Sequence, residues 1–116
     1  MEREKTFFLA AEVEGRSVAS SEINRQMGNQ KHVGVVGIVI EKSFRELGLG
    51  TAMMRVLIEQ AEKMGLKVLA PTAFASNKRA IHVYEKVESA QTGLIPKKHL
   101  RQGNNIDEVI MTKLLG

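Results

Sequence analysis

Three residues near the middle of the chain, Arg45, Gly48 and Gly50, have the types and spacing of an anion-binding turn. An apolar run, Val33 to Ile40, precedes them, and an amphipathic helical pattern follows them. The first backbone N–H groups of a helix have no partner within the helix, and the helix dipole favours negative charge beside them. A strand, a basic glycine-rich turn and a helix start, in this order, therefore predict a site for a phosphate-bearing cofactor.

Two other glycine-rich phosphate-binding patterns do not match this turn. A dinucleotide-binding fingerprint requires a third glycine where Met53 stands. A Walker loop requires Gly-Lys-Ser/Thr after a longer spacer, and the sequence has no such run. The pattern that remains is Arg-x-x-Gly-x-Gly, from Arg45 to Gly50, between a predicted strand and a predicted helix.

A second segment, from Asn77 to Lys86, lies downstream and reads Asn-Lys-Arg-Ala-Ile-His-Val-Tyr-Glu-Lys. Together the two segments resemble the signature of the GNAT acetyltransferase superfamily, which is Arg/Gln-x-x-Gly-x-Gly/Ala followed by Asn-x-x-Ala-x-x-x-Tyr-Glu-Lys. The resemblance extends from about Phe7 to the C-terminus. It implies that the chain is an N-acetyltransferase that moves the acetyl group of acetyl-CoA to a primary amine, by direct attack in a ternary complex.

The resemblance also implies which residues bind the cofactor. Backbone N–H groups of the turn would hold the pyrophosphate, Arg45 would orient the loop or meet a phosphate, and the strand before the turn would meet the pantetheine arm together with Asn77. The implied cofactor-binding residues are Ile38, Ile40, Arg45, Glu46, Gly48, Leu49, Gly50, Thr51 and Asn77.

Direct attack by an amine needs no enzyme nucleophile, but it needs oxyanion donors, a general acid and a base. The resemblance implies that Tyr84, the single tyrosine of the chain, points its hydroxyl at the thioester sulfur as the acid. In the histone-acetylating branch of the family a glutamate acts as base at the position of His32, thirteen residues before Arg45. His32 is therefore the predicted base. His82 and His99 have no partners at metal-ligand spacing, so no metal site is predicted.

Hydrophobic periodicity and turn residues predict the elements that position these groups. Strands are expected over Phe7 to Val13, Ser17 to Asn24, His32 to Ile40, Lys67 to Thr72, Ser89 to Ile95 and Asp107 to Leu114. Helices are expected from Leu49 to Met64, with Gly65 as its C-cap, and from Asn77 to about Val87. Pro71 should weaken the end of its strand, and Gly103-Asn104 should form a turn. The order β-β-β-α-β-α-β-β predicts an α/β (α+β) fold with a mixed, mostly antiparallel sheet and a central right-handed parallel β-α-β unit.

Composition limits the remaining possibilities. A length of 116 residues predicts one domain, residues 1–116, and the absence of cysteine excludes disulfides and thiolate metal sites. The apolar run from Phe7 to Ala11 is too short for a signal peptide or a membrane span, so a cytoplasmic protein is expected. A net charge of +4 is compatible with nucleic acid, but one tyrosine and no tryptophan argue against a base-stacking surface.

The chain departs from the family pattern at both ends of the resemblance. It begins at what looks like the family's second strand, without the first strand and the two helices that commonly border the acceptor site. A second copy of the chain is therefore expected to cover exposed apolar surface in a homodimer. Glu88 and Ser89 stand where the family has Gly-Phe, so a turn glycine and a packing aromatic are missing. These departures leave open an alternative function, a catalytically impaired CoA-binding sensor or interaction domain.

Overall fold

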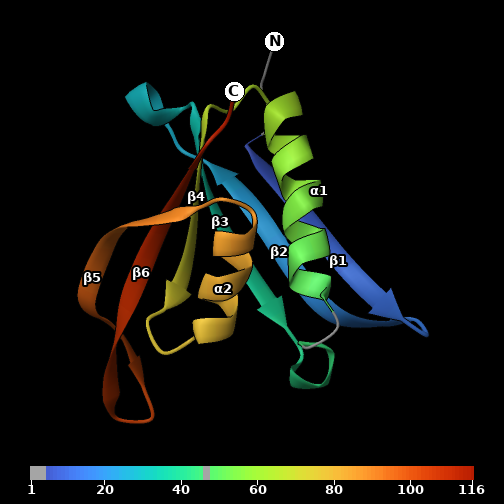
Figure 1. Ribbon diagram of the computed structural model, residues 1–116, viewed down its shortest axis with the longest axis vertical. Helices are drawn as coiled ribbons and strands as arrows, with labels where there is room; N and C mark the ends of the chain where they lie inside the picture. The colour runs from blue at the N-terminus through green and yellow to red at the C-terminus, as the bar shows by residue number, and fades with distance from the viewer. Residues whose placement is uncertain (1–4, 46–47) are drawn as a thin grey trace.

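The structure is a computed structural model that describes residues 5–45 and 48–116. The elements in these residues are β1 (Thr6–Val13), β2 (Arg16–Arg25), the 3₁₀ turn η1 (Gly28–Gln30), β3 (Val33–Ile40), the 3₁₀ turn η2 (Lys42–Phe44), α1 (Leu49–Lys63), β4 (Val68–Phe74), α2 (Lys78–Lys86), β5 (Ala90–Arg101) and β6 (Asn104–Leu114). The strands form one sheet in the order β1-β2-β3-β4-β6-β5 (Figure 1). The pair β3–β4 is parallel and the other neighbouring pairs are antiparallel. The predicted mixed sheet with a central parallel β-α-β unit is confirmed.

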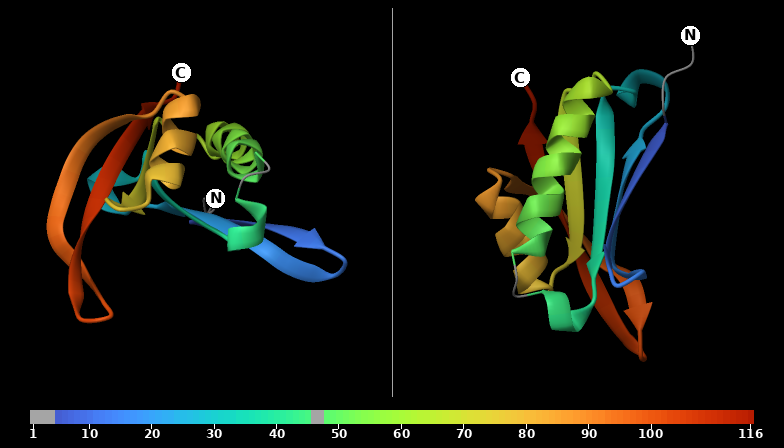
Figure 2. Two further views of the ribbon diagram at one scale, coloured as in Figure 1. Left: turned by 60° about the horizontal axis from the view of Figure 1, so that its bottom comes forward. Right: turned by 90° about the vertical axis from the view of Figure 1, so that its right-hand side faces the viewer.

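The core lies between the sheet and the two helices, which pack against each other on one of its faces (Figure 2). The predicted apolar stripe of α1 faces the sheet and forms part of this core, with Leu57 and Ala61 fully buried. The same buried cluster includes Val36 of β3 and Leu69 of β4. Full burial of one such aliphatic side chain contributes about 1.5–3 kcal/mol, so this stripe is what fixes α1 on the sheet.

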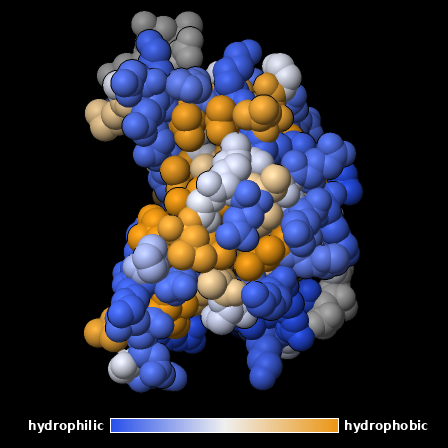
Figure 3. All heavy atoms as spheres, turned by 60° about the vertical axis from the view of Figure 1, so that its left-hand side comes forward, coloured by the Kyte–Doolittle hydropathy of each residue, from blue (hydrophilic) through white to orange (hydrophobic). Residues whose placement is uncertain are grey.

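The opposite face of the sheet carries no helix in the part of the chain that the structure describes (Figure 2). Large apolar side chains on this face stay accessible, since Phe8 is 71% exposed and Val39 is 69% exposed. Figure 3 shows further apolar groups at the surface on the side of the molecule where β5 and β6 lie. One face of the sheet is therefore covered by helices, whereas the other presents exposed apolar side chains, so a ligand bound between the strands would meet different surroundings on the two faces.

Two strand predictions need correction. The last hairpin is longer than expected, since β5 continues to Arg101 and β6 begins at Asn104, with the turn at Gln102 and Gly103. The strands were predicted too short because residues 97–105 are polar, but cross-strand pairing extends both strands to the turn. Pro71 does not end its strand, because β4 continues to Phe74. The β4–β6 ladder omits Ala70 and Pro71, where a proline has no N–H to donate, and resumes at Thr72.

The C-terminus of α2 holds Glu88 in a left-handed conformation, with φ of 66°. The Ser89 N–H donates to the Tyr84 carbonyl and the Glu88 N–H donates to the Glu85 carbonyl, which together form a Schellman motif. This motif favours glycine at the position of Glu88, where the family pattern also has glycine. Ser89, where the family has phenylalanine, is buried, and its hydroxyl has no hydrogen-bond partner among residues 5–45 and 48–116. Both departures therefore cost stability.

We expect Glu88→Gly to raise the free energy of unfolding by about 1 kcal/mol, because a side chain in the left-handed region costs about 1–2 kcal/mol. Urea unfolding of the two proteins measures this difference. Glu85→Gly, the same substitution inside α2, is the matched control and should lower stability by about 1 kcal/mol. A loss of stability in both variants would show that Glu88 is not strained.

Candidate active site

The site forms where the parallel strands β3 and β4 separate (Figure 1). Their pairing runs from Val33–Val68 to Val36–Pro71 and stops there. On its other side β3 stays paired with β2 as far as Ile40. The last half of β3 therefore has a partner on one side and an open edge on the other.

Hydrogen bonds at the two ends of β3 show which backbone groups face this opening. The His32 carbonyl accepts from the N–H groups of Lys67 and Val68, toward β4, whereas the Glu41 N–H donates to the Val18 carbonyl, toward β2. Backbone groups alternate in direction along a strand, so those of Ile38 and Ile40 face β4. The structure thus brings the backbone of Ile38 to the unpaired edge, where it can bind an extended ligand. The Ile40 carbonyl already accepts from Arg45 Nε at 2.9 Å.

A cleft of about 780 Å³ passes through this opening. On the helix side it is lined by the start of α1 and by α2, and on the other side by residues of β1, β2 and the β5–β6 hairpin. Its basic lining residues are Arg45, Arg79, Lys86 and Arg101, with the histidines His82 and His99. A cleft that is basic and open on both faces of the sheet can hold a phosphate-bearing ligand on one side and a second molecule on the other.

The start of α1 borders this cleft, and glycine is required at positions 48 and 50 for different structural reasons. Gly48 is the N-cap and has φ of 72°, a left-handed conformation that disfavours any side chain. Gly50 is buried, and a Cβ atom there would lie 3.2 Å from both Ile40 Cδ1 and Val83 Cγ2. Gly50 therefore lets α1 begin close to β3 and α2. In this geometry the N–H groups of Leu49, Gly50 and Thr51 lack carbonyl partners within the helix.

Tyr84 reaches the opening from α2. Its ring is buried, and its hydroxyl donates to the Thr72 carbonyl at 3.1 Å, one residue beyond the last β3–β4 pair. Burial raises the pKa of Tyr84 to about 12, so the phenol stays protonated throughout the neutral range. This hydroxyl has one proton to donate, so it must turn from the Thr72 carbonyl to become a hydrogen-bond donor for a group bound between the strands.

Asn77 lines the cleft at the start of α2. Its side-chain oxygen accepts from the Ala80 N–H at 3.1 Å, so Asn77 is the N-cap of this helix, as its position before the apolar pattern suggested. Capping uses the oxygen of the amide and leaves the NH₂ group as the donor that could meet a ligand.

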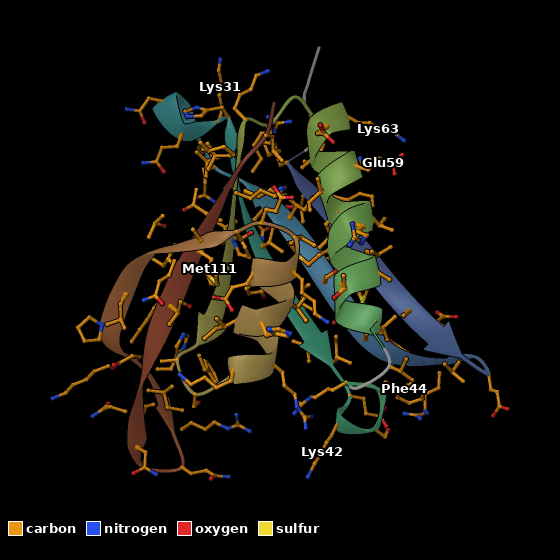
Figure 4. All side chains as sticks on the ribbon, in the orientation of Figure 1. Lys31, Lys42, Phe44, Glu59, Lys63 and Met111 are labelled. Carbon is orange, nitrogen blue, oxygen red and sulfur yellow. The ribbon has the colours of Figure 1, made fainter. Side chains whose placement is uncertain are left out.

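The other predicted site residues are placed differently. Glu46 lies outside the described residues. His32 precedes β3 at its far end, six residues or roughly 20 Å from Ile38, and does not line the cleft. Figure 4 shows this separation, because Lys31, beside His32, lies at the opposite end of the molecule from Lys42 and Phe44 of the η2 turn. The structure does not bring His32 together with Tyr84.

Sequence reasoning missed a group of residues on the helix-free side of the cleft. Glu108 of β6 is buried, and its carboxylate binds Lys98 Nζ at 2.7 Å and His99 Nε2 at 3.1 Å. Burial alone would raise the pKa of Glu108, but the hydrogen bonds and charges of Lys98 and His99 outweigh it and hold the pKa below its usual value. The sequence offered one indication of this cluster, because Glu108 lies in an otherwise apolar predicted strand. A buried carboxylate there needs a hydrogen-bonding or charged partner. These partners were missed because the predicted strand ended at Ile95, before Lys98 and His99.

Comparison with known proteins identifies the class of molecule to which this geometry belongs. The model of the acetyltransferase (GNAT) family matches residues 1–88. The chain therefore belongs to the GNAT acetyltransferase family. It is 29% identical over 108 residues to the L-amino acid N-acetyltransferase AaaT of Escherichia coli K12, an alignment that covers 91% of this chain and 67% of AaaT.

Solved structures agree with this assignment. The acetyltransferase of the GNAT family from Streptococcus pneumoniae superposes with a TM-score of 0.86 at 28% identity, covering 97% of this chain and 68% of that one. The structure of yncA from Salmonella typhimurium, solved with its cofactor acetyl-CoA, superposes with a TM-score of 0.85 at 17% identity, covering 94% and 64%. The chain thus spans about two thirds of the length of these proteins.

Two structural findings bear on the predicted partners. Among residues 5–45 and 48–116, the structure has no helix long and apolar enough to cross a membrane. Over the same residues, no group of three or more histidine, aspartate or glutamate side chains is placed to hold a metal ion.

Proposed function

We propose that this protein is a cytoplasmic N-acetyltransferase that binds acetyl-CoA in the opening between β3 and β4 and transfers the acetyl group to a primary amine. The observation that carries the proposal is the convergence of three groups on one cleft: the start of α1, the unpaired backbone edge at Ile38, and the Tyr84 hydroxyl. Membership of the GNAT family supports acetyl-CoA as the cosubstrate.

Each group has a role in this proposal. N–H groups at the start of α1 bind the pyrophosphate, with Arg45 fixing the preceding turn through its bond to the Ile40 carbonyl. The backbone of Ile38 and the amide of Asn77 bind the pantetheine arm. A backbone N–H on the open edge stabilises the thioester oxyanion, a contribution that is often the largest single term in acyl transfer. The Tyr84 hydroxyl stabilises negative charge on the departing sulfur.

The acceptor class that we propose to test first is free L-amino acids. The support is the name of AaaT, an L-amino acid N-acetyltransferase to which this chain is 29% identical. Fold similarity by itself does not select an acceptor, so primary amines such as polyamines and peptide N-termini belong in the same screen.

Binding of acetyl-CoA is the first testable step. At about 100 times its dissociation constant, a ligand that binds only the folded state stabilises it by roughly 2.7 kcal/mol, which for a domain of this size raises the melting temperature by about 10 °C. Thermal unfolding with and without acetyl-CoA measures the shift, and free adenosine, which lacks the pyrophosphate and the pantetheine arm, serves as a weaker-binding comparison. An unchanged melting temperature at millimolar acetyl-CoA would sink the proposal.

A second candidate function is a CoA-binding domain that does not catalyse transfer. It is favoured by the helix-free face, which leaves the acceptor side of the cleft open in the described residues. The two candidates predict the same melting shift but differ in turnover. Release of free CoA thiol in the presence of an amine panel supports the enzyme, and a melting shift without thiol release supports the binding domain.

Association of two copies of the chain stays a prediction. The exposed Phe8 and Val39 on the helix-free face give such a contact an apolar surface to cover. Sedimentation at micromolar concentration tests it, and a monodisperse monomer would argue against the dimer.

A further inference from the structure

The buried carboxylate of Glu108 organises a cluster on the helix-free side of the cleft. Its two oxygens have separate partners, since Oε2 accepts from Lys98 Nζ at 2.7 Å and Oε1 lies 3.1 Å from His99 Nε2. The imidazole of His99 also packs on the Phe74 ring, with the ring centroids 4.8 Å apart. Two independent contacts therefore fix the His99 ring in one orientation.

The charge of Glu108 decides which nitrogen of His99 carries a proton. The pKa of Glu108 is held below its usual value, so at neutral pH the carboxylate is ionised and can only accept hydrogen bonds. His99 Nε2 must then be the donor, and in the neutral imidazole the other nitrogen, Nδ1, is an unprotonated acceptor. No hydrogen-bond partner for Nδ1 occurs in the described part of the chain. His99 is thus preset as a proton acceptor.

His99 lies in the same cleft as Tyr84 but approaches it from the other face of the sheet. Both residues line the cleft, and the side chain of His99 is 33% exposed. The Tyr84 hydroxyl marks the opening at Thr72, and Phe74, on which His99 packs, is two residues further along β4, about 6.6 Å. An acceptor bound between Thr72 and Phe74 on this side of the cleft would therefore lie next to both residues.

We propose that His99 is the general base of the acetyl transfer and that Glu108 is the residue that positions it. The inference rests on the proposed function. It assigns the role of base to His99, because the predicted base His32 lies at the far end of β3, outside the cleft. His99 Nδ1 takes one proton from the ammonium group of the acceptor, directly or through one water. The freed amine lone pair forms the C–N bond to the acetyl carbon, and the C–S bond then breaks.

The protons balance in this scheme. The first proton of the ammonium group passes to His99 and from there to solvent. The second leaves the nitrogen as the amide forms and ends on the CoA thiolate, giving free CoA thiol. The imidazolium that forms in between is stabilised by the Glu108 carboxylate, as in other histidine–carboxylate pairs.

The charged groups around His99 come from two strands. Glu108 of β6 faces it directly, and Lys98 of β5 is paired with the same carboxylate. Arg101 of β5 lies over the Phe74 ring, with its guanidinium carbon 6.0 Å from the ring centroid. Phe74 of β4 contributes no charge. A pH profile of the reaction therefore reports on His99 within the field of these three groups.

The test compares steady-state kinetics of the full chain and of His99→Gln, using thiol release from acetyl-CoA with a panel of free L-amino acids and spermidine. Glutamine can keep a hydrogen bond to Glu108 but cannot act as a base. We expect kcat to fall by about 10²–10⁴-fold, the usual contribution of general acid–base catalysis, while the Kd for acetyl-CoA measured by calorimetry stays the same. The acid limb of kcat/KM, in the range where histidine side chains titrate, should vanish.

Further variants test whether His99 acts as a base or only stabilises the β5–β6 hairpin. His99→Ala should regain activity when imidazole is added, which a purely structural role would not allow. Glu108→Gln should lower kcat by about tenfold and displace the acid limb, whereas Glu59→Gln should leave kcat unchanged. Glu59 is a matched control because it lies on the solvent side of α1 and pairs only weakly with Lys63, at 3.6 Å (Figure 4).

The outcomes distinguish this inference from the proposed function. If the unmodified chain is active and His99→Gln keeps the same activity and the same acid limb of the pH profile, the inference about His99 is wrong, but the proposed function stands. Loss of activity in a His32→Gln variant with His99→Gln active would overturn it in favour of the other histidine. Binding of acetyl-CoA by the unmodified chain without turnover of any amine would overturn both the inference and the enzymatic function.

Discussion

We expect Gly50→Val to raise the Kd for acetyl-CoA by about tenfold or more and to lower the free energy of unfolding by about 1–3 kcal/mol. A Cβ atom at this position would already lie 3.2 Å from Ile40 Cδ1 and from Val83 Cγ2, and valine adds two methyl groups to it. The first turn of α1 must therefore move away from β3 and α2. A displacement that costs only about 1.4 kcal/mol of binding free energy accounts for a tenfold loss of affinity.

The matched control for Gly50 is Gly34→Ala. A Cβ atom at Gly34 would lie 2.7 Å from Ile23 Cγ2 and 2.8 Å from Leu66 Cδ1, so this variant also loses stability by overpacking. Gly34 does not line the cleft. Isothermal titration at a temperature where both variants are folded should give an unchanged Kd for Gly34→Ala. Equal losses of affinity in the two variants would mean that the start of α1 has no special part in binding.

We expect Tyr84→Phe to lower kcat by about 100-fold or more, with little change in the Kd for acetyl-CoA. The substitution removes one hydroxyl at the opening between the strands and keeps the buried ring. A phenol whose pKa is about 12 is a weaker acid than a thiol, whose ordinary pKa is about 8.5. Complete proton transfer to the thiolate is therefore unfavourable, and we expect the hydroxyl to act by donating a hydrogen bond to the developing charge on sulfur. Steady-state kinetics with the best amine acceptor measure this loss.

The pH dependence gives a second measurement for Tyr84. Because its pKa lies near 12, the hydroxyl does not ionise below about pH 11, and the kcat profiles of Tyr84→Phe and of the unmodified chain should have the same shape. If the rate difference disappeared at any pH between 6 and 10, the hydroxyl would not be the donor.

Stability at alkaline pH should respond to the same group. The pKa of Tyr84 rises from 10.0 to about 12 on folding, so the unfolded chain ionises first and stability is lost as pH increases from 10 to 12. Two pKa units at 1.36 kcal/mol each correspond to about 2.7 kcal/mol. Urea unfolding at pH 8 and at pH 11.5 should show a smaller loss in Tyr84→Phe than in the unmodified chain.

Local signals were sufficient for most of the elements. Gly65 follows α1 in the left-handed conformation that its C-cap prediction required, and Asn77 caps α2 through its side chain. Such signals act over one or two turns of chain, so a single sequence carries them completely. The β5–β6 hairpin was predicted too short because its strands are polar and exposed, and their pairing depends on each other rather than on an apolar pattern.

The sequence by itself determined the family and the order of the elements, and it singled out the turn from Arg45 to Thr51 that we propose to bind the cofactor. These depend on residue types at short spacing, namely glycines where a helix must start close to its neighbours and an asparagine where the next helix begins. The tertiary structure decided which distant residues share the cleft. In it, β3 and β4 separate beyond Pro71, and the Tyr84 hydroxyl contacts Thr72. His32 lies at the far end of the sheet, whereas His99 contacts Glu108. The pairing of strands fixes these contacts, and strand pairing joins residues whose separation along the chain has no readable pattern.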